Sequence, residues 1–196
     1  MREILIVLVC YLIGAIPFSY ISARILAKTD VRIRGSGNVG TTNVLRTSGI
    51  KAALLALIGD LLKGVFAAWL GLTLGGVIMA AVCSLAAIIG HCFPIYLKFK
   101  GGKAVATAGG AIFFLMPKVG ILLLAIFVLT ILLSRYVSLG SILAALTVPF
   151  ASYIFNYPWP YVVLSVLMAV IVLFRHRVNI IRLRQGNETK VGSAIK

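Results

Sequence analysis

The residues best suited to chemistry lie in a short polar segment, residues 34–46, of a chain that is 61% hydrophobic. The segment reads Arg34-Gly-Ser-Gly-Asn-Val-Gly-Thr-Thr-Asn-Val-Leu-Arg46 and contains no acidic residue. Its glycines allow tight turns and a close approach of the backbone to a ligand. Backbone N–H groups and a bidentate guanidinium are well suited to phosphate. The segment therefore predicts an anion site, with a solvated loop as the alternative, and the expected phosphate contacts are Ser36, Gly37, Asn38, Gly40, Thr41, Asn43 and Arg46.

Two nucleotide-binding patterns overlap this segment, and we exclude both. Gly35-x-Gly37-x-x-Gly40 has the spacing of a dinucleotide fingerprint, but that pattern carries meaning only within a strand–turn–helix unit. Only residues 31–34 are available to form the preceding strand. The same glycines also imitate a phosphate-binding P-loop, yet Thr41 stands where that loop requires a lysine.

Two further polar segments contain basic residues. The second is Lys100-Gly-Gly-Lys103, in which Lys100, Gly101, Gly102 and Lys103 are expected to bind phosphate; the alternative is a plain turn whose lysines meet lipid headgroups. The third runs from residue 175 to residue 188 and places His176, Asn179 and Arg182 three residues apart, so they can share one helix face. The alternative for this segment is a basic helix lying on anionic lipid.

The elements that must position these segments are membrane helices. The mean hydropathy is +1.10 and the apolar runs are long, which predicts an all-α integral membrane protein with residues 1–196 forming a single domain. The net charge of +15 would suggest nucleic acid in a soluble protein. Here the basic residues lie between apolar runs, so we expect anionic substrates and membrane lipid as partners, and no nucleic acid. Three cysteines form no C-x-x-C pair, and no metal site is expected.

The apolar runs predict a bundle of seven transmembrane helices. They cover approximately residues 4–27, 51–72, 77–97, 104–116, 119–133, 142–155 and 161–174, with a kink at Pro17 and a short, glycine-interrupted fourth run. Fifteen basic residues then fall on one side of the membrane and only Arg2 and Lys118 on the other. By the positive-inside rule the N-terminus is outside and the C-terminus is cytoplasmic, as are the three polar segments.

This topology places helix starts beside the polar segments. The second, fourth and sixth runs begin on the cytoplasmic side, the sixth after residues 138–141. Each helix start presents unpaired N–H groups and about half a positive charge, which favours an anion. Ser141 is therefore added to the expected phosphate contacts. Deeper in the second run, Asp60 and Lys63 are expected to pair as structural support, and His91 in the third run to be a packing histidine.

Together the three polar segments resemble the signature segments of the bacterial acyl-phosphate-dependent glycerol-3-phosphate acyltransferases, the PlsY family. The resemblance rests on residues 36–46, 100–107 and 175–188 in this order and spacing, with Thr41 and Ala104 as minor departures. It implies transfer of an acyl chain from acyl phosphate to the 1-hydroxyl of glycerol 3-phosphate at the cytoplasmic face of the cell inner membrane, without a cofactor. It also implies that His176 and Asn179 matter for activity, and we expect these two to be catalytic. Arg182 and Glu188, in the same segment, are expected to give structural support.

A membrane transporter for a phosphorylated anion is the main alternative. Transporters place their site near the bilayer midplane, whereas the polar segments here gather at one face. A lipid-binding scaffold would leave the glycines unexplained.

The sequence offers few carboxylates as a base. The four acids are Glu3, Asp30, Asp60 and Glu188, and none is expected beside the reacting hydroxyl. We therefore expect the acceptor's own phosphate to help remove the hydroxyl proton, with His176 supplying hydrogen bonds.

Overall fold

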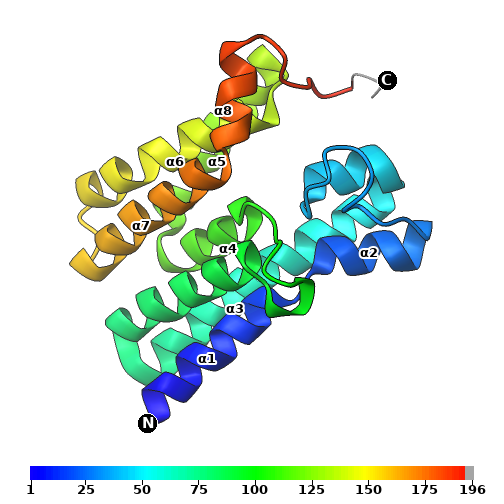
Figure 1. Ribbon diagram of the computed structural model, residues 1–196. Coiled ribbons are helices and arrows are strands. Elements are labelled where there is room, and N and C mark those ends of the chain that lie inside the picture. The colour runs from blue at the N-terminus through cyan, green and yellow to red at the C-terminus, as the bar shows by residue number, and fades with distance from the viewer. Residues whose placement is uncertain (193–196) are drawn as a thin grey trace.

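The computed structural model describes residues 1–192 as an all-α protein. Figure 1 shows the helices, whose bounds are α1 Arg2–Ala15, α2 Phe18–Ala27, α3 Thr41–Cys92, η1 Ile95–Leu97, α4 Val105–Leu115, α5 Pro117–Ser134, α6 Val137–Ile154, α7 Trp159–Arg175 and α8 Arg177–Arg184. The expectation of an all-α fold is confirmed.

Three backbone breaks shape the N-terminal half. The first apolar run bends at Ile16–Pro17, as proline requires, because it cannot donate the backbone hydrogen bond. Within α3, Gly49 (φ 82°) and Gly76 (φ 70°) leave the helical conformation. Because φ in this range favours glycine, α3 consists of three helical pieces, residues 41–48, 50–75 and 77–92. The last two correspond to the second and third predicted runs, which turn back at Gly76.

The predicted spans differ in length. Four stretches are long and apolar enough to cross a membrane, namely residues 2–27, 41–97, 117–134 and 137–154, and the bent pair α7–α8 can be counted as a fifth. The second of these stretches contains α3, which folds back on itself at Gly76. Helix α4 has only 11 residues, about 17 Å at 1.5 Å per residue, against a hydrocarbon core of about 30 Å. The fourth run is thus too short to cross alone as a straight helix.

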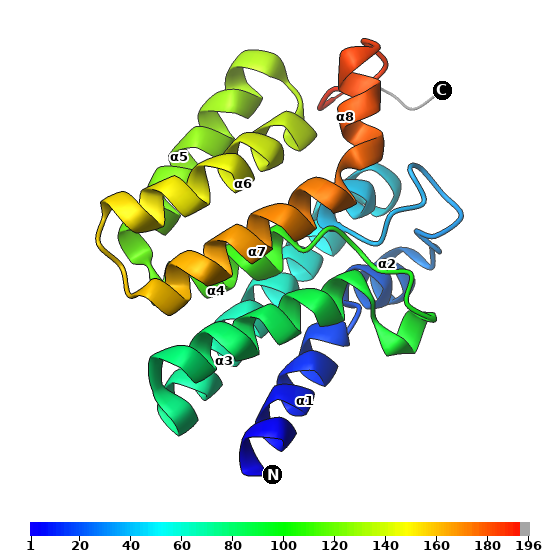
Figure 2. The ribbon, with the colours of Figure 1, turned by 60° about the vertical axis from the view of Figure 1, so that its left-hand side comes forward.

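The helices form two groups. Helices α1, α2 and α4 pack on α3, while α5, α6 and α7 pack in sequence, and contacts α3–α7 and α4–α5 join the groups. Figure 2 shows α7 beside α4, with α5 and α6 on its far side. Small residues bring α3 and α4 close together: a Cβ on Gly64 would meet the Thr107 backbone, and one on Gly110 the Leu61 backbone. Such close backbone approach is the usual way helices associate in membranes.

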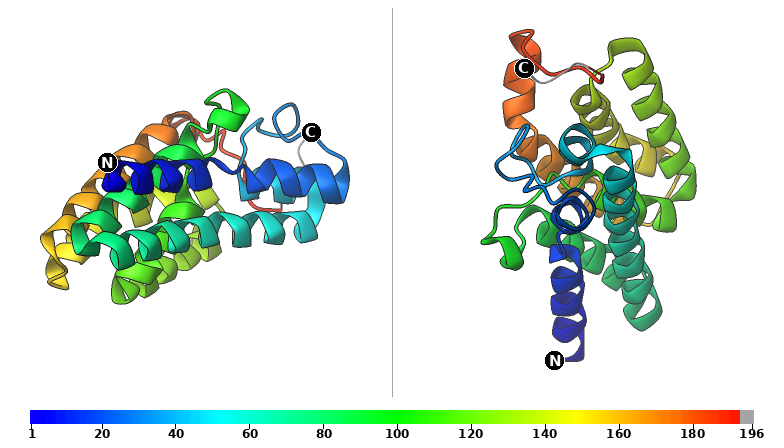
Figure 3. Two further views of the ribbon diagram at one scale, coloured as in Figure 1. Left: turned by 90° about the horizontal axis from the view of Figure 1, so that it is seen from below. Right: turned by 90° about the vertical axis from the view of Figure 1, so that its right-hand side faces the viewer.

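The polar segments lie at one end of the molecule. Figure 1 and the right-hand view of Figure 3 both place α8 and the loop between α2 and α3 at the end opposite the N-terminus. The bends at Pro17 and Gly76, together with the hairpins, bring segments far apart in the sequence to this end.

Candidate active site

A large cavity opens between the two helix groups. Its volume is about 1140 Å³. One end is polar and draws on all three polar segments: Ser36, Gly37, Asn38, Gly40, Thr41, Asn43, Arg46, Lys100, Gly101, Lys103, Ser138, Ser141, Arg175, His176, Asn179, Arg182 and Glu188. The remainder is an apolar groove lined by α3 to α7, including Leu61, Val65, Phe113, Leu124, Phe127 and Met168. The predicted convergence of the three segments is confirmed, with Gly102 as the exception.

Asn43 organises the first segment instead of offering its side chain to a ligand. It is 2% exposed, and its Nδ2 donates to the carbonyl oxygens of Val31 (2.9 Å), Arg34 (3.1 Å) and Asn38 (3.0 Å). Its Oδ1 accepts from the Ser36 N–H at 2.9 Å. Since every polar atom of this amide is engaged within the loop, the prediction that the Asn43 side chain contacts phosphate is wrong. The loop that it holds presents Ser36 to Thr41 to the cavity.

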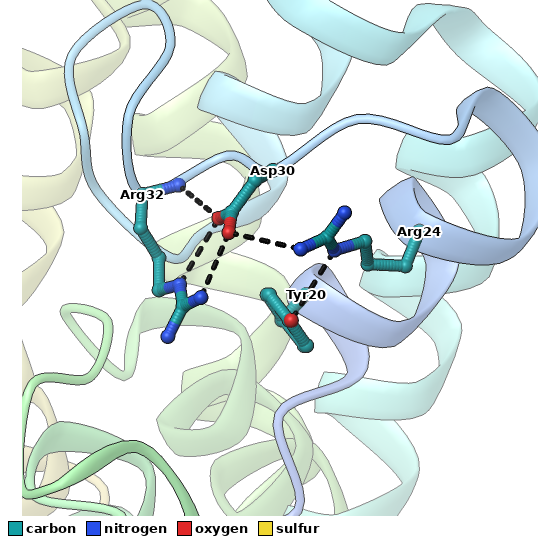
Figure 4. Close-up of polar contacts among 4 residues, drawn as sticks. All are labelled: Tyr20, Arg24, Asp30 and Arg32. Carbon is teal, nitrogen blue, oxygen red and sulfur yellow. Dashed lines mark hydrogen bonds and ion pairs between the residues drawn. The ribbon is translucent and has the colours of Figure 1, made fainter.

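A second anchor precedes the loop, as Figure 4 shows. Asp30 accepts from the Arg32 guanidinium at 2.7 and 3.0 Å and from Arg24 on α2 at 3.3 Å, and both arginines lie over the Tyr20 ring. The hydrogen bond from Arg32 lowers the pKa of Asp30 to about 2. Asp30 is therefore ionised and held by its two arginine partners.

Gly101 and Gly102 have no spare N–H groups. The Gly101 N–H donates to the Cys92 oxygen at 3.2 Å, and the Gly102 N–H donates to the His91 oxygen at 3.1 Å. A Cβ on Gly102 would collide with the His91 ring and with the Val39 oxygen at 2.5 Å. The prediction that these N–H groups cradle phosphate is wrong: both glycines are required by close packing against the end of α3.

Arg175 fixes the same loop from the other helix group. Its guanidinium donates to the carbonyl oxygens of Gly101 (2.6 Å) and Gly102 (2.9 Å), and it lies 5.4 Å from the centre of the Phe93 ring. Sequence reasoning missed this role. The signal was available, since Arg175 directly precedes His176, but the carbonyl partners are visible only in three dimensions.

A chain of hydrogen bonds crosses the polar end. Lys103 Nζ donates to Asn179 Oδ1 at 2.5 Å, Asn179 Nδ2 donates to Glu188 Oε1 at 2.7 Å, and Ser138 Oγ donates to the same oxygen at 2.8 Å. Glu188, expected as a support residue, is held by Asn179 and Ser138. Among residues 1–192, Glu188 Oε2 is the buried side-chain oxygen without a hydrogen-bond partner. Ser138 is a site residue that the sequence analysis did not select.

His176 lies in the bend between α7 and α8 with only 2% exposed. Its Nδ1 is 2.8 Å from the Val172 carbonyl oxygen, which can only accept, so Nδ1 carries the proton and Nε2 is an acceptor. Burial, reinforced by the nearby Lys103 charge, lowers the pKa of His176 to about 4. Burial contributes more to this shift than the neighbouring Arg175 does.

The remaining predicted site residues also line the cavity. Burial lowers the pKa of Lys103 to about 8. Arg46 donates to the Thr189 oxygen at 3.1 Å. It lies in the second turn of its helix, whereas the sequence analysis placed it at a helix start. Ser141 donates to the Val137 oxygen at 3.0 Å. Lys100 is exposed, and Arg182 lines the cavity.

The predicted ion pair within α3 is confirmed. Lys63 Nζ lies 2.8 Å from Asp60 Oδ1, with 2% and 3% of the two side chains exposed. His91 packs beside them, as expected. Within residues 1–192, no three His, Cys, Asp or Glu side chains gather as metal ligands would.

Comparisons with known proteins point to one family over nearly the whole chain. The family profile described as glycerol-3-phosphate acyltransferase matches residues 4–186. The glycerol-3-phosphate acyltransferase of Syntrophomonas wolfei subsp. wolfei is 52% identical over 191 residues, covering 97% of this chain and 98% of the relative. Glycerol-3-phosphate acyltransferase 2 of Moorella thermoacetica is 46% identical over 189 residues, covering 96% and 97% of the two chains.

Two crystal structures of PlsY (YgiH), an integral membrane glycerol 3-phosphate acyltransferase, share this fold. The glycerol 3-phosphate form matches with a TM-score of 0.93 and the lysophosphatidic acid form with 0.91. Both are 34% identical to this chain, and each match covers 98% of this chain and 96% of the other. The chain is an integral multi-pass membrane protein, and it belongs to the PlsY family of glycerol-3-phosphate acyltransferases.

Proposed function

We propose that this protein transfers an acyl chain from acyl phosphate to the 1-hydroxyl of glycerol 3-phosphate, releasing lysophosphatidic acid and phosphate. The observation that carries the proposal is the cavity itself, in which a cationic, hydrogen-bonding end continues into an apolar groove. A long-chain acyl phosphate has this same division between an anionic head and an apolar tail. The related PlsY structures in glycerol 3-phosphate and lysophosphatidic acid forms support the acceptor and the product.

The polar end divides into two parts. The loop held by Asn43 supplies Ser36 and the backbone of residues 37–41, and Arg46 and Lys103 supply positive charge. These groups suit the phosphates of donor and acceptor. His176 Nε2 and the Asn179 amide lie on the α7–α8 side and would orient the acceptor hydroxyl.

In the reaction, the 1-hydroxyl oxygen attacks the carbonyl carbon of the donor. The bond between that carbon and the bridging phosphate oxygen then breaks, and phosphate leaves with the electron pair. Holding the two reactants in line and stabilising the developing oxyanion are the principal tasks, because the leaving group is already good. The hydroxyl proton passes to the acceptor's own phosphate, whose second pKa is about 6 by analogy with phosphoserine. Neutral His176 is too weak a base for this role at neutral pH.

We propose a seven-span arrangement with the N-terminus outside. Two hydrophobic pieces of α3 separated at Gly76, the bent α1–α2 pair and helices α4 to α7 supply seven passes, of which α4 requires the adjoining loop to reach the polar region. The cationic end of the cavity then faces the cytoplasm under the positive-inside rule. A reporter fused to each terminus and assayed in intact cells tests this topology.

The choice of donor is the sharpest test of the proposal. Purified protein should form lysophosphatidic acid from palmitoyl phosphate and glycerol 3-phosphate, and should form at least about a hundredfold less from palmitoyl-CoA, since the thioester lacks the small anionic head. Equal rates with the thioester would contradict the assignment of the donor. Uptake of labelled glycerol 3-phosphate into vesicles without acylation would instead support a transporter.

A further inference from the structure

A buried polar cluster includes Asp60 and His91, which also line the cavity, and the proposed reaction does not use it. Asp60 Oδ1 accepts from Lys63 at 2.8 Å, Asp60 Oδ2 accepts from Ser19 at 3.3 Å, and the His91 ring lies 3.4 Å away. His91 Nδ1 also shares a hydrogen bond of 3.1 Å with Thr107 at the start of α4. All five side chains are at most 8% exposed.

The cluster is tied to the break between α1 and α2. Lys63 Nζ donates to the Ile16 oxygen at 3.0 Å. That carbonyl belongs to the residue directly before Pro17, where the helix is interrupted. Three segments far apart in the sequence, at residues 16–19, 60–63 and 91–107, therefore meet at one pair of charges.

The other side of His91 supports the second polar segment. The Gly102 N–H donates to the His91 oxygen, and Gly102 packs so closely on the His91 ring that even one added carbon would collide with it. The next residue is Lys103, whose ammonium donates to Asn179 in the cavity. The position of the His91 ring thus determines where the backbone before Lys103 lies.

A buried ion pair contributes little net stability to a helix bundle. Removing two charges from water carries a large free-energy cost, and replacing such a pair with apolar residues of similar size is often neutral or stabilising. Packing alone therefore does not explain a charged pair here. The pair does provide a defined geometry, since Asp60 contacts His91, and His91 is in turn hydrogen-bonded to Thr107.

We propose that Asp60, Lys63, His91 and Thr107 form a positioning device that sets the Gly101–Lys103 backbone, and with it the Lys103 ammonium, for phosphate binding. The proposal rests on the proposed function for its activity readout. Asp60 and Lys63 are positioning residues that act through His91, and Lys103 is the group that meets the substrate.

The first experiment removes the pair without leaving a lone charge. The double variant Asp60→Leu/Lys63→Met keeps the volume apolar and should melt within a few degrees of wild type in detergent, whereas either single variant leaves an unpaired buried charge and should be much less stable. Despite its stability, the double variant should lose at least about tenfold in kcat/KM for glycerol 3-phosphate. Ser84→Ala, which removes another buried hydroxyl on α3 bonded only to its own helix, is the control with unchanged activity. A stable double variant with wild-type kcat/KM would overturn the proposal.

The second experiment asks whether the cluster acts through Lys103. Thr107→Val keeps the side-chain shape but removes the hydroxyl beside His91, and should lower kcat/KM about tenfold. In a Lys103→Gln background the same change should have little further effect, because linked residues are not additive. If the losses in kcat/KM from Thr107→Val and Lys103→Gln are fully additive in free energy, Thr107 has a structural role only and the proposal is overturned. This result decides the question even if Asp60→Leu/Lys63→Met fails to fold. If the wild-type protein shows no acyl transfer, the same double-mutant cycle is measured from the affinity for glycerol 3-phosphate by calorimetry. A failure of the proposed reaction is then distinguished from a failure of the positioning proposal.

Discussion

At the scale of single residues, Lys103 and His176 show how burial sets the charge of ionisable side chains at the site. Both lie next to the cavity, and for both the pKa falls because the charged form is removed from water. The consequences differ. Lys103, with a pKa of about 8, remains mostly charged at neutral pH and can meet a phosphate, whereas His176, at about 4, is neutral.

The lowered pKa of Lys103 predicts a loss of activity in alkali. As the pH rises through about 8 the free enzyme loses the ammonium proton, so kcat/KM for glycerol 3-phosphate should fall with a midpoint near that value. Bound phosphate favours the charged lysine, so the fall in kcat should occur at higher pH. Lys103→Arg should remove the alkaline fall, since arginine stays charged, although the rate decreases. An unchanged alkaline midpoint in that variant would assign the fall to another group.

Replacing His176 tests the assignment of the proton acceptor. His176→Gln keeps hydrogen-bonding capacity, so kcat should fall no more than about tenfold, or ~1.4 kcal/mol of barrier. Loss of a general base typically costs about 10²–10⁴ in rate. Glu188→Gln is the matched comparison, because Glu188 is the carboxylate that the structure brings beside Asn179. A loss of several orders of magnitude in one variant, with glycerol 3-phosphate binding intact, would make that residue the base.

At the scale of elements, the sequence predicts where the polar segments meet but not how their atoms are used. The breaks at Pro17 and near Gly76 follow from residue type, and the apolar runs predict most helices. The helix starts were misplaced: the first segment ends in a helix of its own, residues 41–48, because Gly49 adopts a conformation that ends it. Composition alone does not reveal that break, since many glycines remain helical.

The roles of polar atoms were the least predictable feature. Asn43 and the Gly101 and Gly102 N–H groups have the chemistry of phosphate ligands, and only the fold shows that other parts of the chain already occupy them. Ser138 and Arg175 were missed for the same reason, because their partners are 50 and more than 70 residues away.

Helix α4 predicts a test of the apolar groove. Gly109 borders the cavity, and a Cβ there would meet only Leu61 Cδ2, at 3.8 Å, so a side chain has room to enter the groove. Gly109→Leu should therefore raise KM for palmitoyl phosphate about tenfold and leave KM for glycerol 3-phosphate nearly unchanged. Phe114→Leu, on the exposed side of the same helix, is the control. Equal rises in both KM values would contradict placement of the acyl chain in this groove.

At the scale of the whole molecule, two helix groups that pack together through α3–α7 and α4–α5 enclose one cavity with a charged end and an apolar end. The polar segments gather at its charged end because helix bends and hairpins return the chain to the same face three times. The apolar end lies among α3 to α7, where an acyl chain can remain in an apolar environment while its head meets the charged end. An arrangement of this kind allows a membrane-borne donor and a water-soluble acceptor to react in one place.

The central claim is that both substrates react within this cavity. The most direct measurement is phosphate release from palmitoyl phosphate by the purified protein, with and without glycerol 3-phosphate, alongside the lysophosphatidic acid formed. The account predicts release that depends on glycerol 3-phosphate and equals the lysophosphatidic acid in amount, and that is strongly reduced in Lys103→Gln. Rapid phosphate release without the acceptor, or release without lysophosphatidic acid, would contradict it.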